Sequence, residues 1–303
     1  MDNKLYPYYQ PNFAEYNIAQ KLALPYLDKD NNLVISFATA VGKTVLAEYA
    51  FAYHLQQDKE SRVVYVCPFR SLAFEKYDNW SKEKQLNRYG IAIVTGDTIT
   101  DILQENGARI IIMTSESFDS RTRSGVYRDL LKQVVCIVYD EAHLLGDKNR
   151  GSAIEMSIMR MARINKKARF ILLSATLSNA TEVAKWLKTL NGKPTKSIKS
   201  NWRPVKINIK YFPVEGKIDK VNKAVELAKE LQWFKTIVFV NSKVTGAEIV
   251  KKLRAERIRA MFHNASLPKG KRRLIEEKFK DRMSGYNILV STSTLSSGVN
   301  MAL

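Results

Sequence analysis

Two short segments of the chain hold residues that could bind and hydrolyse a nucleotide. The first is FATAVGKT, residues 37–44, which lies between an apolar stretch at Leu33–Phe37 and a run free of Gly and Pro at Val45–Leu55. This order predicts a strand, a loop and a helix N-terminus, where free N–H groups and the helix dipole favour phosphate. Lys43 would then reach the terminal phosphates, and the Thr44 hydroxyl would ligate Mg2+. The predicted nucleotide-binding residues of this loop are Ala38, Thr39, Ala40, Val41, Gly42, Lys43 and Thr44.

The second segment is VVCIVYDEAH, residues 134–143. Its unbroken apolar start predicts a parallel strand that is buried on both faces. Such a strand delivers Asp140 and Glu141 to its carboxyl end, where open α/β sheets place their ligands. Asp140 would hold the metal ion, and Glu141 would orient or activate water. Alternatively, the two carboxylates only cap a strand–helix turn.

Length and composition narrow the class of protein. A chain of 303 residues is long enough for two domains, each with its own core. No apolar run approaches the roughly 18 residues of a membrane helix, and the N-terminus has no basic segment followed by an apolar one. Cys67 and Cys136 fall in predicted strands, which indicates buried apolar roles, and His54, His143 and His263 lack metal-ligand spacing. We therefore expect a soluble, cytoplasmic protein without a membrane segment.

The charge of the chain is strongly basic and uneven. The net charge is +19, and residues 201–303 hold 21 Lys and Arg against nine Asp and Glu. Residues 1–200 hold the other 28 basic and 21 acidic residues. A basic half favours a polyanionic partner, most simply nucleic acid. The alternative is a lysine-rich solvated surface.

The elements that must position these residues alternate as strands and helices, which is typical of a doubly wound parallel sheet. In the first half the expected strands are Leu33–Phe37, Arg62–Cys67, Ile91–Thr95, Arg109–Met113, Val134–Tyr139 and Phe170–Ser174. Gly, Pro and Asn at Asn191–Pro204 indicate a linker. In the second half we expect strands at Ile207–Phe212, Thr236–Val240, Arg259–Phe262 and Asn287–Ser291, and helices at Lys220–Gln232, Gly246–Glu256 and Lys269–Phe279. The predicted domains are 1–198 and 199–303.

Further short segments accompany the nucleotide-binding loop and the acidic strand end, in a fixed order. Along the first half they are Pro68–Ala73, Thr95–Asp97, Thr114–Glu116, Ser174–Thr176 and Asn201–Val205. Along the second half they are Val238–Lys243, Phe262–Leu267 and Val290–Asn300. In this set and order the chain resembles superfamily-two helicases of the DEAD/DEAH type. Within them it is most similar to the super-killer-like branch, which includes the archaeal Hjm-type repair helicases.

The resemblance implies two RecA-like domains, the second incomplete at its C-terminus, with ATP and Mg2+ bound between them. It implies catalytic roles for Lys43, Asp140, Glu141 and His143, metal binding by Thr44 and Asp140, and nucleotide contacts from Gly298 and Asn300. His143 would couple the nucleotide site to Ser174 and Thr176, or would be only a partly buried, hydrogen-bonded imidazole. Tyr16 and Gln20 would hold adenine. Tyr9 and Gln10 are the rival pair, and a surface helix without a ligand is a further alternative.

The resemblance also implies a track for a nucleic-acid strand. Its expected residues are Pro68, Arg70, Ser71, Thr114, Ser115, Glu116, Asn241, Ser242, His263, Asn264, Thr292, Ser293 and Thr294. They fall at predicted strand ends, where hydroxyls and backbone amides suit phosphates and read no sequence. Each of them alone could be only a turn former. Ser117 stands where many relatives have Lys.

The function that we expect is an ATP-dependent helicase or translocase core. It would move 3′ to 5′ along single-stranded or branched nucleic acid, DNA more than RNA, as a monomer. In the family a Gln/Gly/Arg-rich segment follows, which supplies arginines to the γ-phosphate, but only Met301–Leu303 come after Asn300. We therefore expect a truncated form that is weak in hydrolysis and unwinding. The alternatives are a non-catalytic ATP- and strand-binding module and, less favoured, a small-molecule kinase.

Overall fold

A computed structural model describes residues 7–96, 107–292 and 295 of the chain. Contacts divide the chain into two units, Met1–Lys206 and Ile207–Leu303. Each unit has its own sheet and its own apolar clusters. The predicted domain boundary, between residues 198 and 199, falls shortly before this division.

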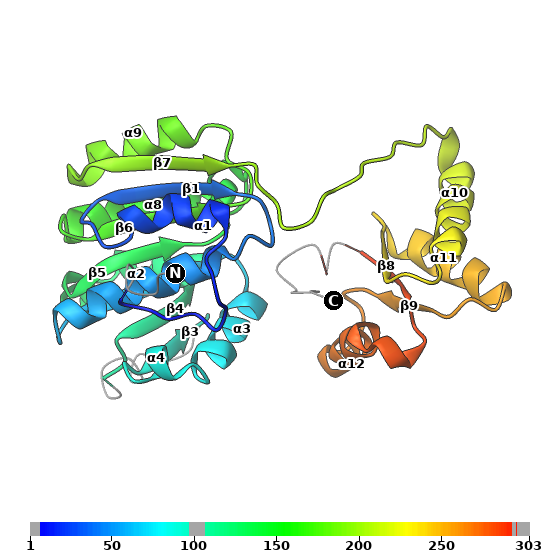
Figure 1. Ribbon diagram of the computed structural model, residues 1–303, viewed down its shortest axis with the longest axis horizontal. Coiled ribbons are helices and arrows are strands. Elements are labelled where there is room, and N and C mark those ends of the chain that lie inside the picture. The colour runs from blue at the N-terminus through cyan, green and yellow to red at the C-terminus, as the bar shows by residue number, and fades with distance from the viewer. Residues whose placement is uncertain (1–6, 97–106, 293–294, 296–303) are drawn as a thin grey trace. The chain divides into compact units, whose positions relative to one another are not determined.

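The first unit is built on a seven-stranded sheet in which every strand pair is parallel. The strand order is β3-β4-β2-β5-β6-β1-β7 (Figure 1). The strands are β1 Asn32–Phe37, β2 Arg62–Cys67, β3 Ile91–Val94, β4 Ile110–Thr114, β5 Val134–Tyr139, β6 Arg169–Ser174 and β7 Thr195–Ser200. The six strands predicted from apolar runs are confirmed, each within one residue of its expected bounds.

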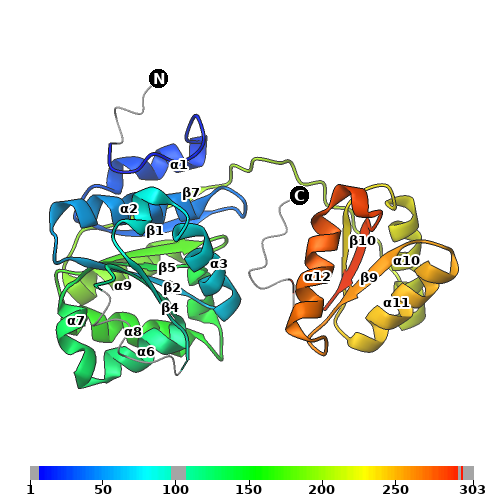
Figure 2. The same ribbon diagram turned by 90° about the horizontal axis from the view of Figure 1, so that it is seen from below.

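Helices cover both faces of this sheet (Figure 2). On one face lie α1 Ile18–Ala23, α2 Lys43–Gln57, α3 Arg70–Trp80 and α4 Lys84–Asn87, and on the other α6 Ser115–Arg123, α7 Arg128–Lys132, α8 Gly151–Ile164 and α9 Ala180–Asn191. Successive strand residues point to opposite faces, so Val63 and Tyr65 join one apolar cluster and Val64 joins the other. Cys67 and Cys136 are buried and free, as predicted, and burial raises the pKa of each thiol to about 12.

The segment predicted as a linker, Asn191–Pro204, instead contains an edge strand, β7, which pairs with β1. The prediction was wrong because β7 has only one buried residue, Ile198, among Lys, Ser and Thr. Such a strand lacks the apolar run that marks an interior strand, and its lysines protect the open edge of the sheet. The Gly192 and Pro194 signals mark the turn between α9 and β7, where Gly192 has a φ of 75°.

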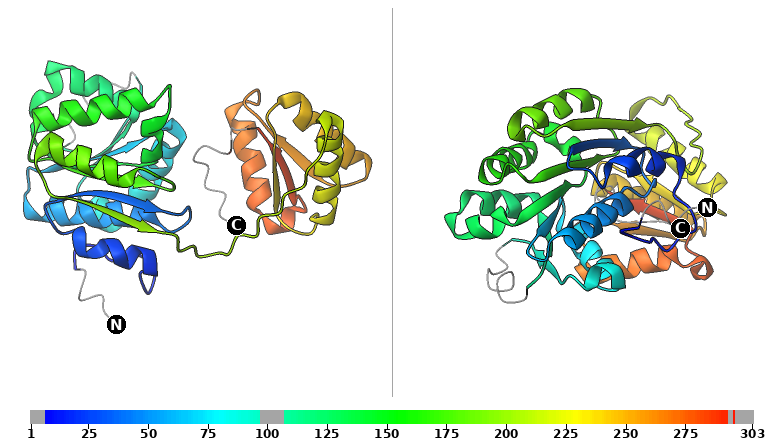
Figure 3. Two further views of the ribbon diagram at one scale, coloured as in Figure 1. Left: turned by 90° about the horizontal axis from the view of Figure 1, so that it is seen from above. Right: turned by 60° about the vertical axis from the view of Figure 1, so that its left-hand side comes forward.

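The second unit has a three-stranded parallel sheet in the order β8-β10-β9. Its strands are β8 Thr236–Phe239, β9 Ala260–His263 and β10 Ile288–Ser291. Apolar clusters place α10 Gly216–Glu230 and α11 Lys243–Ala255 on one face and α12 Lys269–Lys280 on the other (Figure 3). These three strands and three helices are the predicted ones, with small differences at their ends.

The strand predicted at Ile207–Phe212 is wrong. The segment has no regular structure, and Ile209 and Tyr211 are 90% and 88% exposed. Alternating apolar residues favour a strand only where a sheet or core accepts one face of it. Among the described residues no strand pairs with this segment.

No helix within the described ranges has both the length and the apolar character needed to cross a membrane.

Candidate nucleotide and nucleic-acid sites

The strand order brings the two phosphate-chemistry segments to one edge of the first sheet. β6 lies between β5 and β1, so the loops that follow these three strands are neighbours. From β1 the chain passes through α2 to β2, which lies beyond β6 and β5. Such a change of direction opens a crevice at the carboxyl ends of the strands, where doubly wound sheets bind ligands.

The phosphate loop ends at Gly42, which caps α2 with a φ of 80°. Ala40 also has a positive φ, 62°, a conformation that L-residues seldom adopt and that functional loops often retain. The Lys43 ammonium turns back into the loop and donates to the carbonyls of Phe37 and Ala38 at 3.1 and 3.2 Å. Burial lowers the pKa of Lys43, while the charges of Glu141 and Asp140 oppose that shift.

Asp140 is held in place from two sides. The Tyr65 hydroxyl donates to one carboxylate oxygen at 2.6 Å, and the backbone N–H of Glu141 donates to the other at 2.9 Å. Burial raises the pKa of Asp140, and the hydrogen bond from Tyr65 opposes this. The Thr44 hydroxyl accepts a hydrogen bond from Lys76 at 3.1 Å. A carboxylate and a hydroxyl are oxygen donors of the kind that Mg2+ prefers, with water and phosphate completing its shell.

Lys76 was not assigned a role from the sequence. Its side chain is buried on α3, yet it reaches the loop residue Thr44, and its charge acts on both Asp140 and Glu141. The sequence held one signal for such a role, which is that Lys76 occupies a position on the apolar side of its helix. Only the packing of α3 beside α2 shows which residue this lysine meets.

Glu141 and His143 form a pair just after β5. Glu141 has a φ of 51°, and its carboxylate lies 3.3 Å from Nδ1 of His143. The hydrogen bond with His143 lowers the pKa of Glu141, more than burial raises it. Glu141 is therefore ionised at neutral pH and able to accept a proton or a hydrogen bond from water.

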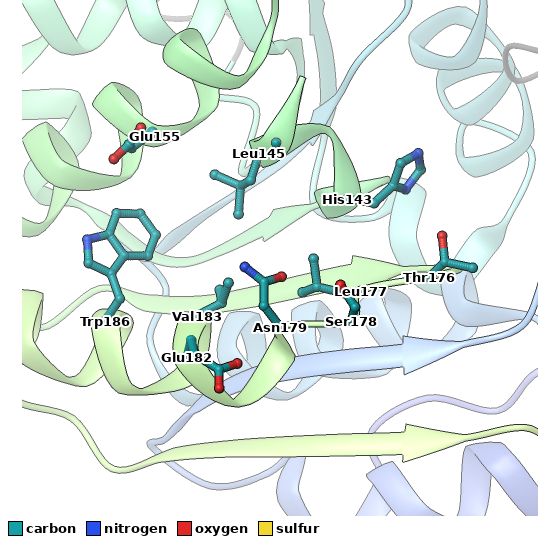
Figure 4. Close-up of a pocket in the computed structure, with 11 residues that line it drawn as sticks. His143, Leu145, Glu155, Thr176, Leu177, Ser178, Asn179, Glu182, Val183 and Trp186 are labelled. Atoms are coloured by element: carbon teal, nitrogen blue, oxygen red, sulfur yellow. The ribbon is translucent and has the colours of Figure 1, made fainter. Parts of the chain in front are cut away.

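His143 also faces the segment that follows β6. It lines a cavity of about 650 Å3 together with Thr176 and Leu177. Figure 4 shows His143 and Thr176 at the same end of this cavity and Trp186 at the other. Ser174 is buried at the end of β6, and its hydroxyl accepts a hydrogen bond from the N–H of Thr176. The structure thus brings the three predicted coupling residues together.

The predicted adenine-binding helix touches the phosphate loop. Gln20 is buried, and its amide donates to the carbonyl of Gly42 at 3.2 Å. Asn17 forms a reciprocal cap with Gln20 and donates to the carbonyl of Val41 at 2.9 Å. The rival residue Gln10 bonds through its backbone to Gln85 instead. The helix α1 thus packs against the phosphate loop, and Asn17, which the sequence reasoning missed, belongs to a recognisable capping box.

Part of the predicted strand track lines a second cavity, of about 470 Å3, at the carboxyl ends of β2 and β4. The predicted residues in its wall are Pro68, Arg70, Thr114 and Glu116. Ser71 is exposed beside Arg70, and Ser115 is buried at the start of α6, outside the wall. Two further residues of the wall, Arg121 and Arg150, were missed, because arginines on helices well away from a strand end carry no motif.

In the second unit, the predicted residues follow the carboxyl ends of the strands. Asn241 is exposed after β8, and Ser242 caps α11 by accepting from the N–H of Thr245. His263 is buried and lies 2.9 Å from Glu276; burial lowers its pKa, and the bond to Glu276 opposes the shift. Two others, Asn264 and Thr292, lie at the ends of β9 and β10. The remaining predictions, Ser293, Thr294, Gly298 and Asn300, lie outside the described residues.

Comparisons with known proteins bear on both units. The family described as "DEAD/DEAH box helicase" matches residues 17–183, and "Helicase conserved C-terminal domain" matches residues 216–302. The chain is 33% identical to ATP-dependent DNA helicase Hel308 of Pyrococcus horikoshii, over 90% of this chain and 42% of the relative. It is 30% identical to Hel308 of Thermoplasma volcanium, over 99% of this chain and 47% of the relative. The chain thus spans less than half the length of these relatives.

Solved helicase structures share the fold. The DUF1998 helicase MrfA, bound to DNA and AMPPNP, superposes with a TM-score of 0.75 at 24% identity, covering 96% of this chain and 43% of MrfA. Dbp5 of S. cerevisiae, bound to RNA and ADP BeF3, gives 0.68 at 20% identity, covering 95% and 72%. At these identities the likeness shows the fold alone. The predicted fold class, RecA-like doubly wound parallel sheets, is confirmed.

Proposed function

The chain belongs to the DEAD/DEAH box helicases, and from this membership we propose that it is the core of an ATP-dependent nucleic-acid helicase. We propose further that it translocates 3′ to 5′ on single-stranded or branched DNA in preference to RNA. The observation that carries the proposal is the joint placement of Lys43, Thr44 and Asp140 at one sheet edge. The kinship with Hel308, named as a DNA helicase, favours DNA.

Each residue of the edge has a chemical task in this proposal. Bound ATP and Mg2+ supply the phosphoanhydride that is cleaved and the charge that polarises it. Lys43 exchanges its two carbonyl partners for the terminal phosphates, because an anion is a stronger partner for a buried ammonium. Thr44 and Asp140 hold the metal, and the ionised Glu141 orients the attacking water.

His143 and Gln20 have supporting tasks. His143 holds the Glu141 carboxylate and lines the same cavity as Thr176. A movement of Thr176 can therefore alter the position of His143. Gln20 braces the loop through Gly42, with Tyr16 buried beside it. Gly42 has a φ of 80°, a backbone conformation that side-chain-bearing residues rarely adopt, which favours glycine at this position.

In this proposal each unit contacts the nucleic-acid strand at the carboxyl ends of its own strands. In the first unit Arg70 and Thr114 line the 470 Å3 cavity, and in the second Asn241 and Asn264 follow strand ends. Hydroxyls, amides and arginines at these places favour phosphate over base edges. Binding is therefore expected to depend on salt and to be nearly independent of sequence.

Two variants test the nucleotide site. We expect Lys43→Ala to abolish binding of fluorescent ATP·Mg2+ without lowering the thermal midpoint, because burial already disfavours the Lys43 cation. We expect Glu141→Gln to keep the nucleotide affinity and to reduce single-turnover phosphate release to background, because Asp140 remains. Lys132→Ala, which removes an exposed cation of α7, is the control. Unchanged affinity in Lys43→Ala, or loss of binding in Glu141→Gln, would contradict the roles proposed for these two residues.

A further inference from the structure

We propose that the ammonium of Lys76 takes the place of the metal ion beside Thr44 while no metal is bound, and that it leaves the Thr44 hydroxyl when Mg2+ binds there. Lys76 would thereby set how strongly nucleotide binding depends on the metal. The inference rests on the nucleotide site proposed above, in which Thr44 and Asp140 hold Mg2+. It adds a residue from α3, outside both the phosphate loop and the acidic strand end.

The first observation is the contact between Lys76 and a side chain proposed to bind the metal. The Lys76 ammonium donates to the Thr44 hydroxyl at 3.1 Å. An ammonium has donors and no acceptor, so the Thr44 oxygen supplies a lone pair to this bond. Mg2+ also takes a lone pair from each oxygen ligand, at about 2.0–2.1 Å. Because two cations repel each other strongly at such distances, Lys76 and Mg2+ compete for this oxygen.

The second observation is that Lys76 is a buried cation with a distant ion-pair partner. Its side chain is only 11% exposed. In the described part of the chain its ion pair is with the adjacent Glu75, at the long distance of 3.9 Å. A buried cation is unfavourable unless negative charge nearby compensates it. Lys76 therefore depends on negative charge from other elements.

That negative charge comes from the carboxylates at the end of β5. Burial raises the pKa of Asp140, and the charge of Lys76 is among the effects that oppose this shift. The hydrogen bond with His143 lowers the pKa of Glu141, and the charge of Lys76 acts in the same direction. Lys76 thus favours the ionised form of both carboxylates, as a bound metal ion does. The other ammonium at this edge, that of Lys43, donates to two carbonyls of the phosphate loop.

Two hydrogen bonds, one helical turn apart, join α3 to α2 at this point. Thr44 and Glu48 are four residues apart on α2, and Lys76 and Trp80 are four residues apart on α3. The Trp80 indole N–H donates to the Glu48 carboxylate at 2.7 Å, and the Trp80 ring is buried. This second bond holds the helix pair together without Lys76. Because a lysine has a flexible four-carbon stem, its ammonium can leave Thr44 while α3 stays in place.

The exchange has opposite consequences for the two forms of the nucleotide. Without metal, the Lys76 cation offsets the negative charge of Asp140 and Glu141, which otherwise repels the phosphates, and so it favours binding. With metal, the same cation repels Mg2+ and has to leave Thr44, so it disfavours the metal complex. The ratio of the affinity with Mg2+ to the affinity without it therefore depends on the charge of Lys76. A change in packing alone shifts both affinities alike and leaves the ratio unchanged.

The test measures how tightly the whole chain binds a fluorescent, non-hydrolysable ATP analogue, first in saturating Mg2+ and then in excess EDTA. We expect Lys76→Met to raise the ratio of the two affinities about tenfold, mainly through weaker binding in EDTA. Lys76→Gln keeps a donor for Thr44 but removes the charge, so it should raise the ratio equally. If Lys76→Met does not fold, Lys76→Gln decides by the same criterion.

Two control variants separate the charge of Lys76 from total charge and from packing. Lys82→Met removes an exposed cation just after α3 and should change the ratio less than about twofold. Trp80→Phe removes the other hydrogen bond between α3 and α2 without changing a charge on α3. It should lower the thermal midpoint and leave the ratio as it is in the unaltered chain.

The outcomes also separate this inference from the proposed function. If the unaltered chain binds the analogue and the neutral Lys76 variants have the same ratio, Lys76 only joins α3 to α2 and the inference fails alone. A lower ratio in these variants would also overturn it, because Lys76 would then assist the metal. So would an equal rise in Lys82→Met or Trp80→Phe, or a lack of binding by the unaltered chain in EDTA alone. If the unaltered chain binds no analogue in either condition, the proposed nucleotide site fails as well.

Discussion

The amino ends of the seven parallel strands lie along one side of the first sheet, and their carboxyl ends lie along the opposite side; we call these sides the amino edge and the carboxyl edge. Cations are buried at both, but their hydrogen-bond partners and surroundings differ. At the amino edge, the guanidinium of Arg169 is fully buried and donates to the carbonyls of Tyr26, Leu27 and Asn31 at 2.5–2.6 Å. At the carboxyl edge, the partners of Lys43 are two carbonyls of the phosphate loop, and Arg121 lines a cavity. A buried cation is thus no sign of a binding site by itself, because the carbonyls around Arg169 satisfy it as part of the fold.

The neighbours of Arg169 support its structural role. The ring of His54 lies 3.5 Å from the guanidinium, and burial, together with the charge of Arg169, lowers the His54 pKa to about 3. His54 is therefore neutral at every physiological pH. Asn32, at the same edge, bonds to Phe170, Asn191 and Thr195 and so ties β1 to its two neighbouring strands. In contrast, several polar side chains at the carboxyl edge, among them Arg70, Thr114, His143 and Thr176, line cavities that a ligand can fill.

The largest predicted effect tests the amino edge. We expect Arg169→Met to lower the free energy of unfolding by on the order of 3 kcal/mol, because three buried carbonyls lose their donor. The nucleotide affinity of the folded protein should not change. Urea denaturation and fluorescent-nucleotide binding measure the two quantities, with the exposed Arg163→Met as control, expected within about 0.5 kcal/mol of the unaltered chain. If Arg169→Met kept its full free energy of unfolding but lost nucleotide binding, Arg169 would belong to a binding site and not to the fold.

The second prediction concerns the pH dependence of the carboxyl edge. The hydrogen bond from Tyr65 lowers the pKa of Asp140 against the effect of burial, so Tyr65→Phe should raise that pKa. As the pH falls, the metal-holding carboxylate is then protonated sooner, and Mg2+-dependent nucleotide binding should decline at a higher pH than in the unaltered chain. Binding near neutral pH should change little.

A matched control for this variant lies on the neighbouring strand. Tyr139 is equally buried, and its hydroxyl pairs with Ser157 at 2.9 Å, away from Asp140. Tyr139→Phe therefore removes one buried hydrogen bond without touching the carboxylate. If both variants shift the pH profile alike, lost stability and not the state of Asp140 is the cause.

The sequence allowed prediction of the interior strands and the phosphate loop because their signals are local. A run such as Val134–Tyr139 is apolar at every position. The residues that follow it can therefore be placed at the carboxyl end of a strand without knowledge of the rest of the fold. The edge strand β7 has only Ile198 as an apolar signal and was missed. Conversely, Ile207–Phe212 has the pattern of a strand, but no strand pairs with it in the described part of the chain.

The residues missed at the sites depend on which elements lie side by side. Lys76 contacts Thr44 because α3 lies beside α2, and Arg121 and Arg150 line one cavity because α6 packs against α8. Spacing along the chain holds no information about such meetings. The contact of Asn17 with Val41 could be predicted only in part. The capping box can be recognised from neighbouring residues in the sequence, but its position beside the phosphate loop depends on the fold.

The smallest predicted effect compares an exposed cation at each edge of the sheet. Arg70 lies at the carboxyl edge, in the wall of the cavity of about 470 Å3, and Lys59 lies at the amino edge, between α2 and β2. We expect Arg70→Ala to weaken binding of every single-stranded sequence about threefold, since exposed ionic contacts contribute less than about 1 kcal/mol. The salt slope should fall by at most about 0.7, and Lys59→Ala should change neither quantity. Salt titrations with oligo-dT and a mixed-sequence strand measure both the affinity and the salt slope.

Two outcomes would contradict this prediction. A loss of affinity in Arg70→Ala that depends on the sequence of the strand would mean that this edge reads bases. An equal loss in Lys59→Ala would mean that the basic surface attracts the strand without a defined site.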